Sequence, residues 1–109
     1  MKPKLLSIVI PMFNEKKRIE DTISKITKYL RDKKIKHEII AVDDGSSDDT
    51  VLIVKKIKDK NIRVLKNEKN KGKGYSVRKG ILNCKGDYAL FTDADLSTPI
   101  EELDNFFKC

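Results

Sequence analysis

The chain has 109 residues, which is enough for one small domain and too few for two. Its 24 basic and 17 acidic residues give a formal charge of +7, but the basic residues are spread along the chain rather than gathered in one block. No basic-and-aromatic motif supports nucleic-acid binding, so no nucleic-acid partner is expected. The charge fits a solvated surface, an anionic membrane surface or a phosphorylated ligand.

Several classes of segment are not expected in this chain. The longest apolar run, residues 5–13, is interrupted by Ser7 and Pro11 and falls short of the roughly 20 residues that span a bilayer. The N-terminus lacks the pattern of a signal peptide. The single histidine, His37, excludes a histidine-rich zinc site. Cys84 and Cys109 have neither metal-ligand spacing nor the pattern of a disulfide-rich secreted domain, so a cytoplasmic protein is expected.

Apolar segments with two different periodicities alternate along the chain. Short runs rich in β-branched residues predict buried strands at residues 5–10, 38–42, 62–65 and 88–91. Helical spacing of apolar residues predicts the intervening helices. Their inward-facing residues are Ile19, Ile23, Ile26 and Leu30 in the first, Val51, Val54 and Ile57 in the second, and Val77, Ile81 and Leu82 in the third, which covers residues 75–83.

A fourth helix is predicted at the end of the chain. Residues 98–101 form a capping box with Pro99 at the first helical position, and the helix that follows would bury Leu103, Phe106 and Phe107. Gly80 is unfavourable inside the third helix, and a close backbone approach would explain it. The alternating order predicts an α/β fold, a Rossmann-like, mostly parallel sheet with helices on both faces. Because such sheets usually continue past four strands, a truncated domain is expected.

Carboxylates follow three of the predicted strands. These are Glu15, the pair Asp43 and Asp44, and the pair Asp93 and Asp95. The carboxyl ends of parallel strands share one edge, where ligands of such sheets bind. Hard cations such as Mg²⁺ or Mn²⁺ take oxygen ligands, so the Asp-x-Asp pair predicts a metal site beside a phosphorylated ligand. A solvated acidic turn is the alternative.

Basic residues precede the last predicted strand. Lys71, Lys73 and Arg78 lie on the polar loop and the helix before it. They could reach the same edge of the sheet and balance phosphate charge there. A solvated basic face is the alternative.

Four segments together resemble the successive motifs of the family 2 glycosyltransferases, which have the GT-A fold. They are residues 8–15 (IVIPMFNE), 41–50 (AVDDGSSDDT), 70–80 (NKGKGYSVRKG) and 92–97 (TDADLS). The third and fourth motifs resemble most closely those of the dolichyl-phosphate β-glucosyltransferases, with the dolichyl-phosphate mannosyltransferases next. The resemblance covers nearly all of residues 1–109 and implies the nucleotide-sugar-binding part of a glycosyltransferase domain without the acceptor-binding half.

The resemblance also implies roles for individual residues. Pro11, Phe13 and Glu15 match the motif that packs around the base and ribose of the donor, with Phe13 where a tyrosine is common. Asp43 and Asp44 match the pair that binds uracil and ribose, and Lys73 matches a basic donor contact. Asp93 and Asp95 match the ligands of Mg²⁺ or Mn²⁺ at the diphosphate, with Ala94 between them in the backbone. The residues that bind the acceptor or act as base belong to the missing half.

The implied reaction transfers a sugar from UDP-glucose or GDP-mannose to a polyprenyl or dolichyl phosphate at a membrane, with which the full-length protein would associate. Two alternatives stay open, a nucleotide-sugar-binding fragment without transferase activity and a transferase that acts on a saccharide. A nucleotidyltransferase is disfavoured, because such enzymes have a glycine-rich loop after the first strand and residues 11–15 contain no glycine.

Overall fold

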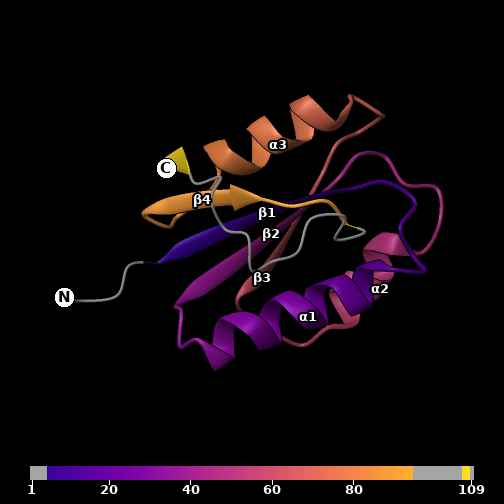
Figure 1. Cartoon of the computed structure of the whole chain (residues 1–109). Helices are drawn as coiled ribbons and strands as arrows, with labels where there is room; N and C mark the ends of the chain where they lie inside the picture. The colour runs from indigo at the N-terminus through magenta and orange to yellow at the C-terminus, as the bar shows by residue number, and fades with distance from the viewer. Residues whose placement is uncertain (1–4, 95–106, 109) are drawn as a thin grey trace.

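The computed structural model describes residues 5–94 and 107–108, which Figure 1 draws as a twisted sheet between helices. In this part of the chain the sheet has five strands in the order β3-β2-β1-β4-β5. The first four are mutually parallel, and β5 is antiparallel to β4. The strands are β1 (Leu6–Met12), β2 (His37–Asp43), β3 (Ile62–Lys66), β4 (Tyr88–Phe91) and β5 (Phe107–Lys108). The predicted mostly parallel sheet is confirmed.

Helices cover both faces of the sheet, as predicted. α1 (Ile19–Asp32) and α2 (Thr50–Lys56) pack on one face, and α3 (Lys73–Leu82) packs on the other (Figure 1). The chain moves in one direction from β1 to β3 and then crosses back to β4, so right-handed crossovers require α3 to lie on the opposite face. The strand order therefore reverses between β1 and β4. Open α/β sheets bind ligands at this reversal, beyond the carboxyl ends of the strands.

The central strand β1 contributes side chains to both layers of the core. Ile8 and Ile10 pack with Ile23 and Ile26 of α1, whereas Val9 faces α3. The alternation arises because successive side chains of a strand point to opposite faces. Both faces are buried, which explains why the sequence of β1 is almost continuously apolar.

The packing of α3 on the sheet depends on Gly80. A Cβ atom at this position would lie only 2.4 Å from Cγ1 of Val9 in the central strand. Any other residue would therefore push α3 away from β1. The close approach of the helix backbone predicted from Gly80 is confirmed, and the group that it approaches is the Val9 side chain.

Both predicted boundaries of the third helix, residues 75–83, differ from the structure. α3 begins at Lys73 rather than at Tyr75 and ends at Leu82 rather than at Asn83. Its first turn starts at once after Gly72, whose carbonyl oxygen accepts a hydrogen bond from the Ser76 N–H.

The prediction that Phe107 lies in a helix is wrong. Phe107 belongs to β5 and pairs with Ala89, because β4 would otherwise leave backbone donors and acceptors unpaired at the edge of the sheet. The capping box at residues 98–101, Leu103 and Phe106 lie outside the described residues. Among the described helices, none is both long enough and apolar enough to cross a membrane.

Candidate functional site

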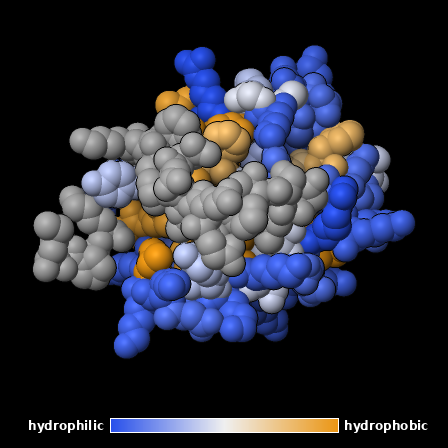
Figure 2. Space-filling view, in the orientation of Figure 1, coloured by the Kyte–Doolittle hydropathy of each residue, from blue (hydrophilic) through white to orange (hydrophobic). Residues whose placement is uncertain are grey.

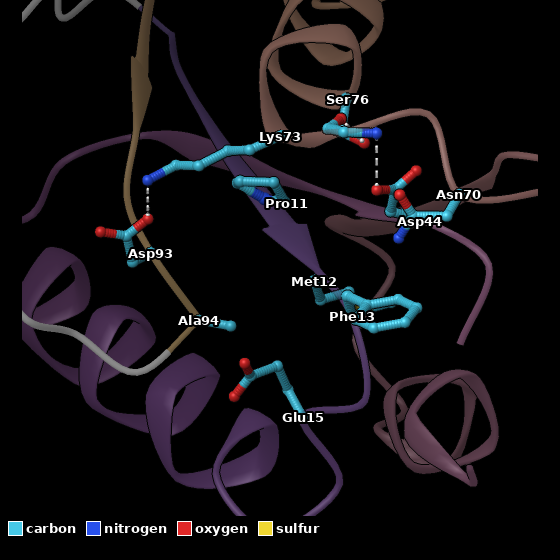
Figure 3. A pocket seen from close by; sticks show the side chains of 11 residues that line it. Pro11, Met12, Phe13, Glu15, Asp44, Asn70, Lys73, Ser76, Asp93 and Ala94 are labelled. Carbon is cyan, nitrogen blue, oxygen red and sulfur yellow. Dashed lines mark hydrogen bonds and ion pairs between the residues drawn. The ribbon is translucent and has the colours of Figure 1, made fainter. Parts of the chain in front are cut away.

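A cavity of about 320 Å³ lies beyond the carboxyl ends of β1 and β4, where the strand order reverses (Figure 3). Its walls come from the loop after β1, the end of β2, the loop before α3 together with the start of that helix, and the end of β4. The lining residues are Pro11, Met12, Phe13, Glu15, Asp44, Asn70, Gly72, Lys73, Ser76, Asp93 and Ala94.

Most of the predicted donor-binding residues meet in this cavity. Pro11, Phe13, Glu15, Asp44, Lys73, Asp93 and Ala94 all line it, although they come from four separate segments of the chain. Asp43 does not line it, and Asp95 lies outside the described residues. Four further lining residues were not predicted from the sequence, namely Met12, Asn70, Gly72 and Ser76.

Asn14 ties the loop after β1 to the loop after β2. Its backbone N–H donates to Ser46 Oγ at 2.8 Å, and its Oδ1 accepts from the N–H groups of Ser47 at 2.9 Å and Asp48 at 3.3 Å. Asn14 has a φ of +50°, a left-handed conformation that asparagine tolerates better than most residues. This anchor fixes Phe13 and Glu15 against the site. An asparagine in the short loop after a strand was a signal that could have identified it.

The adjacent residues Asp43 and Asp44 have different environments. Asp43 is buried, and its carboxylate accepts hydrogen bonds from the N–H of Ser46 at 2.9 Å and from Ser46 Oγ at 2.5 Å. It therefore closes the turn that follows β2. Its side chain faces its own turn rather than the cavity.

Asp44 lies in the cavity wall and holds the loop before α3. One carboxylate oxygen accepts from the Lys71 N–H at 2.7 Å and from Asn67 Nδ2 at 2.8 Å, and the other accepts from the Gly72 N–H at 2.9 Å. Burial raises the pKa of Asp44, but the hydrogen bonds from Lys71, Asn67 and Gly72 outweigh it and keep the pKa below its usual range. Asp44 is therefore an ionised anchor at neutral pH.

Asn67, which was not among the predicted site residues, completes this anchor. Its side-chain amide also donates to Ser76 Oγ at 3.0 Å, and its Oδ1 accepts from Lys79 Nζ at 3.1 Å. Asn67 thus connects the end of β3 to α3 and orients the amide that faces Asp44. A polar residue at the carboxyl end of β3 was the available sequence signal.

On the opposite wall, Asp93 forms an ion pair with Lys73, the first residue of α3 (Figure 3). Both side chains are accessible, with exposed fractions of 36% for Asp93 and 56% for Lys73. The Lys73 ammonium also lies 5.9 Å from the centre of the Phe91 ring. Lys73 therefore lies at the end of the cavity where the metal site is predicted.

Two further contacts hold the chain after β4 and the side chain of Glu15. The backbone oxygen of the buried residue Ala94 accepts a hydrogen bond from Thr22 Oγ1 of α1, which fixes the chain directly after Asp93. Glu15 forms an ion pair with Arg18 at 3.1 Å. The carboxylates predicted at this edge are therefore partly balanced by neighbouring cations.

The carboxylate of Asp93 has the chemistry of a ligand for a hard divalent cation. Its exposure and its position in the cavity wall leave it accessible to such an ion and to a phosphate beside it. Considering only residues 5–94 and 107–108, no group of three histidine, cysteine or carboxylate side chains could enclose a metal. The residues present fit a metal held by one or two carboxylates and by phosphate oxygens.

A parallel sheet with a pocket at the reversal of the strand order places this chain among the open α/β folds, which bind ligands beyond the carboxyl ends of their strands. Residues 7–108 match the family described as "Glycosyl transferase family 2". The chain belongs to this family.

The curated relatives include dolichyl-phosphate beta-glucosyltransferases. The protein from Dictyostelium discoideum is 38% identical over 108 residues, which cover 91% of this chain and 33% of that protein. The protein from Homo sapiens is 36% identical over 114 residues, which cover 96% of this chain and 35% of that protein. The chain spans about a third of the length of these relatives.

Solved glycosyltransferase structures share the fold. A mannosyltransferase from Pyrobaculum calidifontis, in complex with GDP-Man and Mn²⁺, gives a TM-score of 0.75 at 22% identity and covers 91% of this chain and 34% of that chain. A glucosyl-3-phosphoglycerate synthase from Mycobacterium tuberculosis, in complex with UDP, gives a TM-score of 0.69 at 30% identity and covers 85% and 34%. The GT-A fold predicted from the sequence is confirmed.

Proposed function

We propose that this chain is the donor-binding part of a metal-dependent glycosyltransferase that transfers a sugar from a nucleotide sugar to a dolichyl or other polyprenyl phosphate. The supporting observation is the cavity at the strand reversal, which combines apolar walls at Phe13 and Met12 with Lys73 and Asp93 at its other end. A nucleotide sugar has the same division between a nucleoside and a charged diphosphate. The likeness to dolichyl-phosphate beta-glucosyltransferases favours UDP-glucose over GDP-mannose.

The nucleoside would lie against Phe13, Pro11 and Glu15, and the diphosphate would lie between Lys73 and Asp93. Transfer of the sugar leaves additional negative charge on the nucleoside diphosphate. Preorganised cations at that position stabilise such charge, and the Lys73 ammonium is one of them. Mg²⁺ or Mn²⁺, held by Asp93 and by Asp95 as the second expected ligand, would supply further neutralisation of the diphosphate.

A lipid monophosphate is the proposed acceptor because it needs little activation. Its second pKa is near 6, so most of it is dianionic at pH 7, and it needs less help from a general base than a sugar hydroxyl does. The residues that bind the acceptor would come from the part of the relatives that this chain does not span. Binding of the nucleotide-sugar donor can therefore be tested on this chain alone.

Calorimetric titration of the chain with UDP-glucose and GDP-mannose, each with and without Mn²⁺, tests the proposal. We expect Mn²⁺-dependent binding of UDP-glucose, and we expect Asp93→Asn to remove the metal dependence. Asp32→Asn is the matched control, because Asp32 makes an exposed ion pair with Lys28 on α1, away from the cavity.

Each outcome of the titration has a distinct meaning. Binding of neither nucleotide sugar at any metal concentration would refute donor binding. Selective binding of GDP-mannose would move the assignment to the mannosyl branch. A third outcome concerns the acceptor. If the chain binds the donor, and a longer protein transfers the sugar to a saccharide but not to dolichyl phosphate, only the lipid acceptor is refuted.

A further inference from the structure

A second cavity lies at the opposite edge of the sheet from the cavity proposed for the donor. It has a volume of about 620 Å³ and lies at the amino ends of the strands, on the left of the sheet in Figure 1. Its walls come from the end of α1 and the turn that follows, the amino ends of β1, β2 and β3, and the loops before β3 and β4. The two cavities share no lining residue among those that the structure describes.

Five cationic side chains line this second cavity, and carboxylates balance only two of them. Arg31 pairs with Asp59 at 3.1 Å, and Arg63 pairs with Glu38 at 3.2 Å. Within the part of the chain that the structure describes, the other three ammonium groups form no ion pair. These three belong to the exposed residues Lys36, Lys60 and Lys85.

Exposed lysines alone would not mark a binding site. The chain has 24 basic residues, and Figure 2 shows hydrophilic residues over most of the described surface on the face in view. Such residues usually form a solvated surface. The second cavity differs from the rest of this surface because it is also lined by a buried side chain that lacks a partner.

This side chain is His37, at the amino end of β2, with an exposed fraction of 7%. Its Nδ1 lies 3.0 Å from the backbone oxygen of Ile35, which can only accept, so Nδ1 carries the proton in this contact. Nε2 is buried, and residues 5–94 and 107–108 provide no hydrogen-bond partner for it. Because buried polar atoms nearly always have a partner, Nε2 is the ring nitrogen that remains for a ligand.

Glu38 is the one carboxylate among the described lining residues, and its charge is already used. One of its oxygens accepts hydrogen bonds from Ser7 Oγ and from the Lys85 N–H, each at 2.6 Å. The other oxygen accepts from Arg63 Nη2 at 3.2 Å. Glu38 therefore anchors the loop that carries Lys85 and leaves the three lysines as the unbalanced charges of the cavity.

From these observations we infer that the cavity at the amino ends of the strands is a second ligand site, for an anion that carries phosphate. Lys36, Lys60 and Lys85 supply the positive charge, and His37 Nε2 supplies a hydrogen bond. A volume of about 620 Å³ lies within the range of about 300–1,000 Å³ that is typical of small-molecule sites, so a phosphate ester fits as well as a bare phosphate. Soluble phosphate esters and phospholipid headgroups share this chemistry. Since the two cavities share no residue, this inference does not depend on the proposed donor site.

Titration with pyrophosphate, followed by NMR in buffer that contains EDTA, tests the site directly. His37 is the only histidine in the chain, so its ring signals can be assigned without ambiguity. We expect these ring signals to shift together with the amide signals of residues 36–38, 60–63 and 85. Binding should weaken as the salt concentration rises, because exposed charges are screened.

Two double variants separate a site from general charge attraction. Lys60→Gln combined with Lys85→Gln should weaken pyrophosphate binding by about tenfold, because two ammonium contacts are lost while the Lys85 N–H still donates to Glu38. Lys17→Gln combined with Lys56→Gln is the matched control. It removes the same charge from two exposed residues that do not line the cavity, and it should bind pyrophosphate like the wild type.

Sedimentation with vesicles distinguishes the two sources of phosphate. Phosphatidic acid carries a phosphate monoester headgroup, and phosphatidylcholine vesicles with and without it provide the comparison. If the ligand is a soluble phosphate ester, pyrophosphate binds and neither vesicle sediments the chain. If the ligand is a lipid headgroup, only vesicles with phosphatidic acid sediment the chain, and Lys60→Gln with Lys85→Gln abolishes this.

Three results would overturn the inference. Shifts confined to residues 71–73 would place the anion in the other cavity alone. Equal weakening by the two double variants would reduce the effect to net charge. Absence of both pyrophosphate binding and headgroup-dependent sedimentation would refute the site. Failure of UDP-glucose and GDP-mannose to bind would refute the donor site and leave this second site standing.

Discussion

Gly80→Ala separates the intrinsic preference of a helix from the packing of this particular helix. In an isolated helix, replacing glycine by alanine stabilises by about 1 kcal/mol. Here the added Cβ would lie 2.4 Å from Cγ1 of Val9, whereas carbon atoms in ordinary contact are about 3.5–4.0 Å apart. Val9 is fully buried in the central strand and has few alternative rotamers.

The expected sign follows from these two effects. Overpacking of a core costs about 1–3 kcal/mol, and this site lies at the upper end because the contact is so short. After subtracting the gain in helix propensity, we expect Gly80→Ala to lower the free energy of unfolding by about 1–2 kcal/mol. For a domain of this size, each kilocalorie lowers Tm by about 4–8 °C.

Gly74 provides a matched control in the same helix. A Cβ atom at Gly74 would meet no atom within 4 Å, so Gly74→Ala should stabilise by about 0.5 kcal/mol. Urea denaturation of the two variants should therefore give opposite signs. Equal stabilisation by both substitutions would refute the close packing of α3, and so would additive effects of Gly80→Ala and Val9→Ala in a double-mutant cycle.

Three further predictions concern the sheet and the loops around the site. Burial raises the pKa of Glu38, but hydrogen bonds from Ser7 and the Lys85 N–H, with the charge of Arg63, lower it below its ordinary value of 4.5. The contribution of Glu38 to stability is therefore present above about pH 4.5 and is lost as the pH falls through its lower folded pKa. Urea denaturation at a series of pH values should show this loss in the wild type and not in Glu38→Gln. Parallel pH dependence of the two proteins would contradict the prediction. Asn14→Ala should destabilise by about 2 kcal/mol, and Asn14→Gly by less because glycine accepts the φ of +50°; equal losses in chemical denaturation would exclude the backbone contribution. Phe13→Ala should weaken uridine and UDP binding alike, because Phe13 is an apolar wall of the cavity, and a loss restricted to UDP in titration would contradict that position.

The sheet could be predicted from the sequence because its central strands, β1 and β2, are buried on both faces. β1 is almost continuously apolar, and so is the centre of β2 at residues 39–42, a pattern that few other structures require. The end of the chain was not predictable by the same means. Residues 98–101 have the local pattern of a helix start, but Phe107 pairs with Ala89, and an interaction between distant segments is invisible to a local pattern.

The site shows the same division between local and distant information. The predicted strand order implied that carboxylates and a lysine would meet at one edge of the sheet. Seven of the predicted donor-binding residues do line the cavity there. The difference between Asp43 and Asp44 did not follow, because it depends on which loop each carboxylate faces. The anchoring roles of Asn14 and Asn67 required knowledge of partners in other loops.

The central position of β1 has a consequence for the order of folding. β1 precedes both of its partners in the chain, since it pairs on one side with β2 and on the other with β4. Leu6 can therefore reach its partner Tyr88 only when all the residues between them have been synthesised. Pairings between such distant residues form slowly. We expect a nascent chain to assemble β1, β2 and β3 while the second side of β1 waits for β4. Because Asp93 lines the cavity, the proposed nucleotide-sugar donor would stabilise only those chains in which β4 has already docked. We therefore expect the donor to slow unfolding more than it accelerates folding.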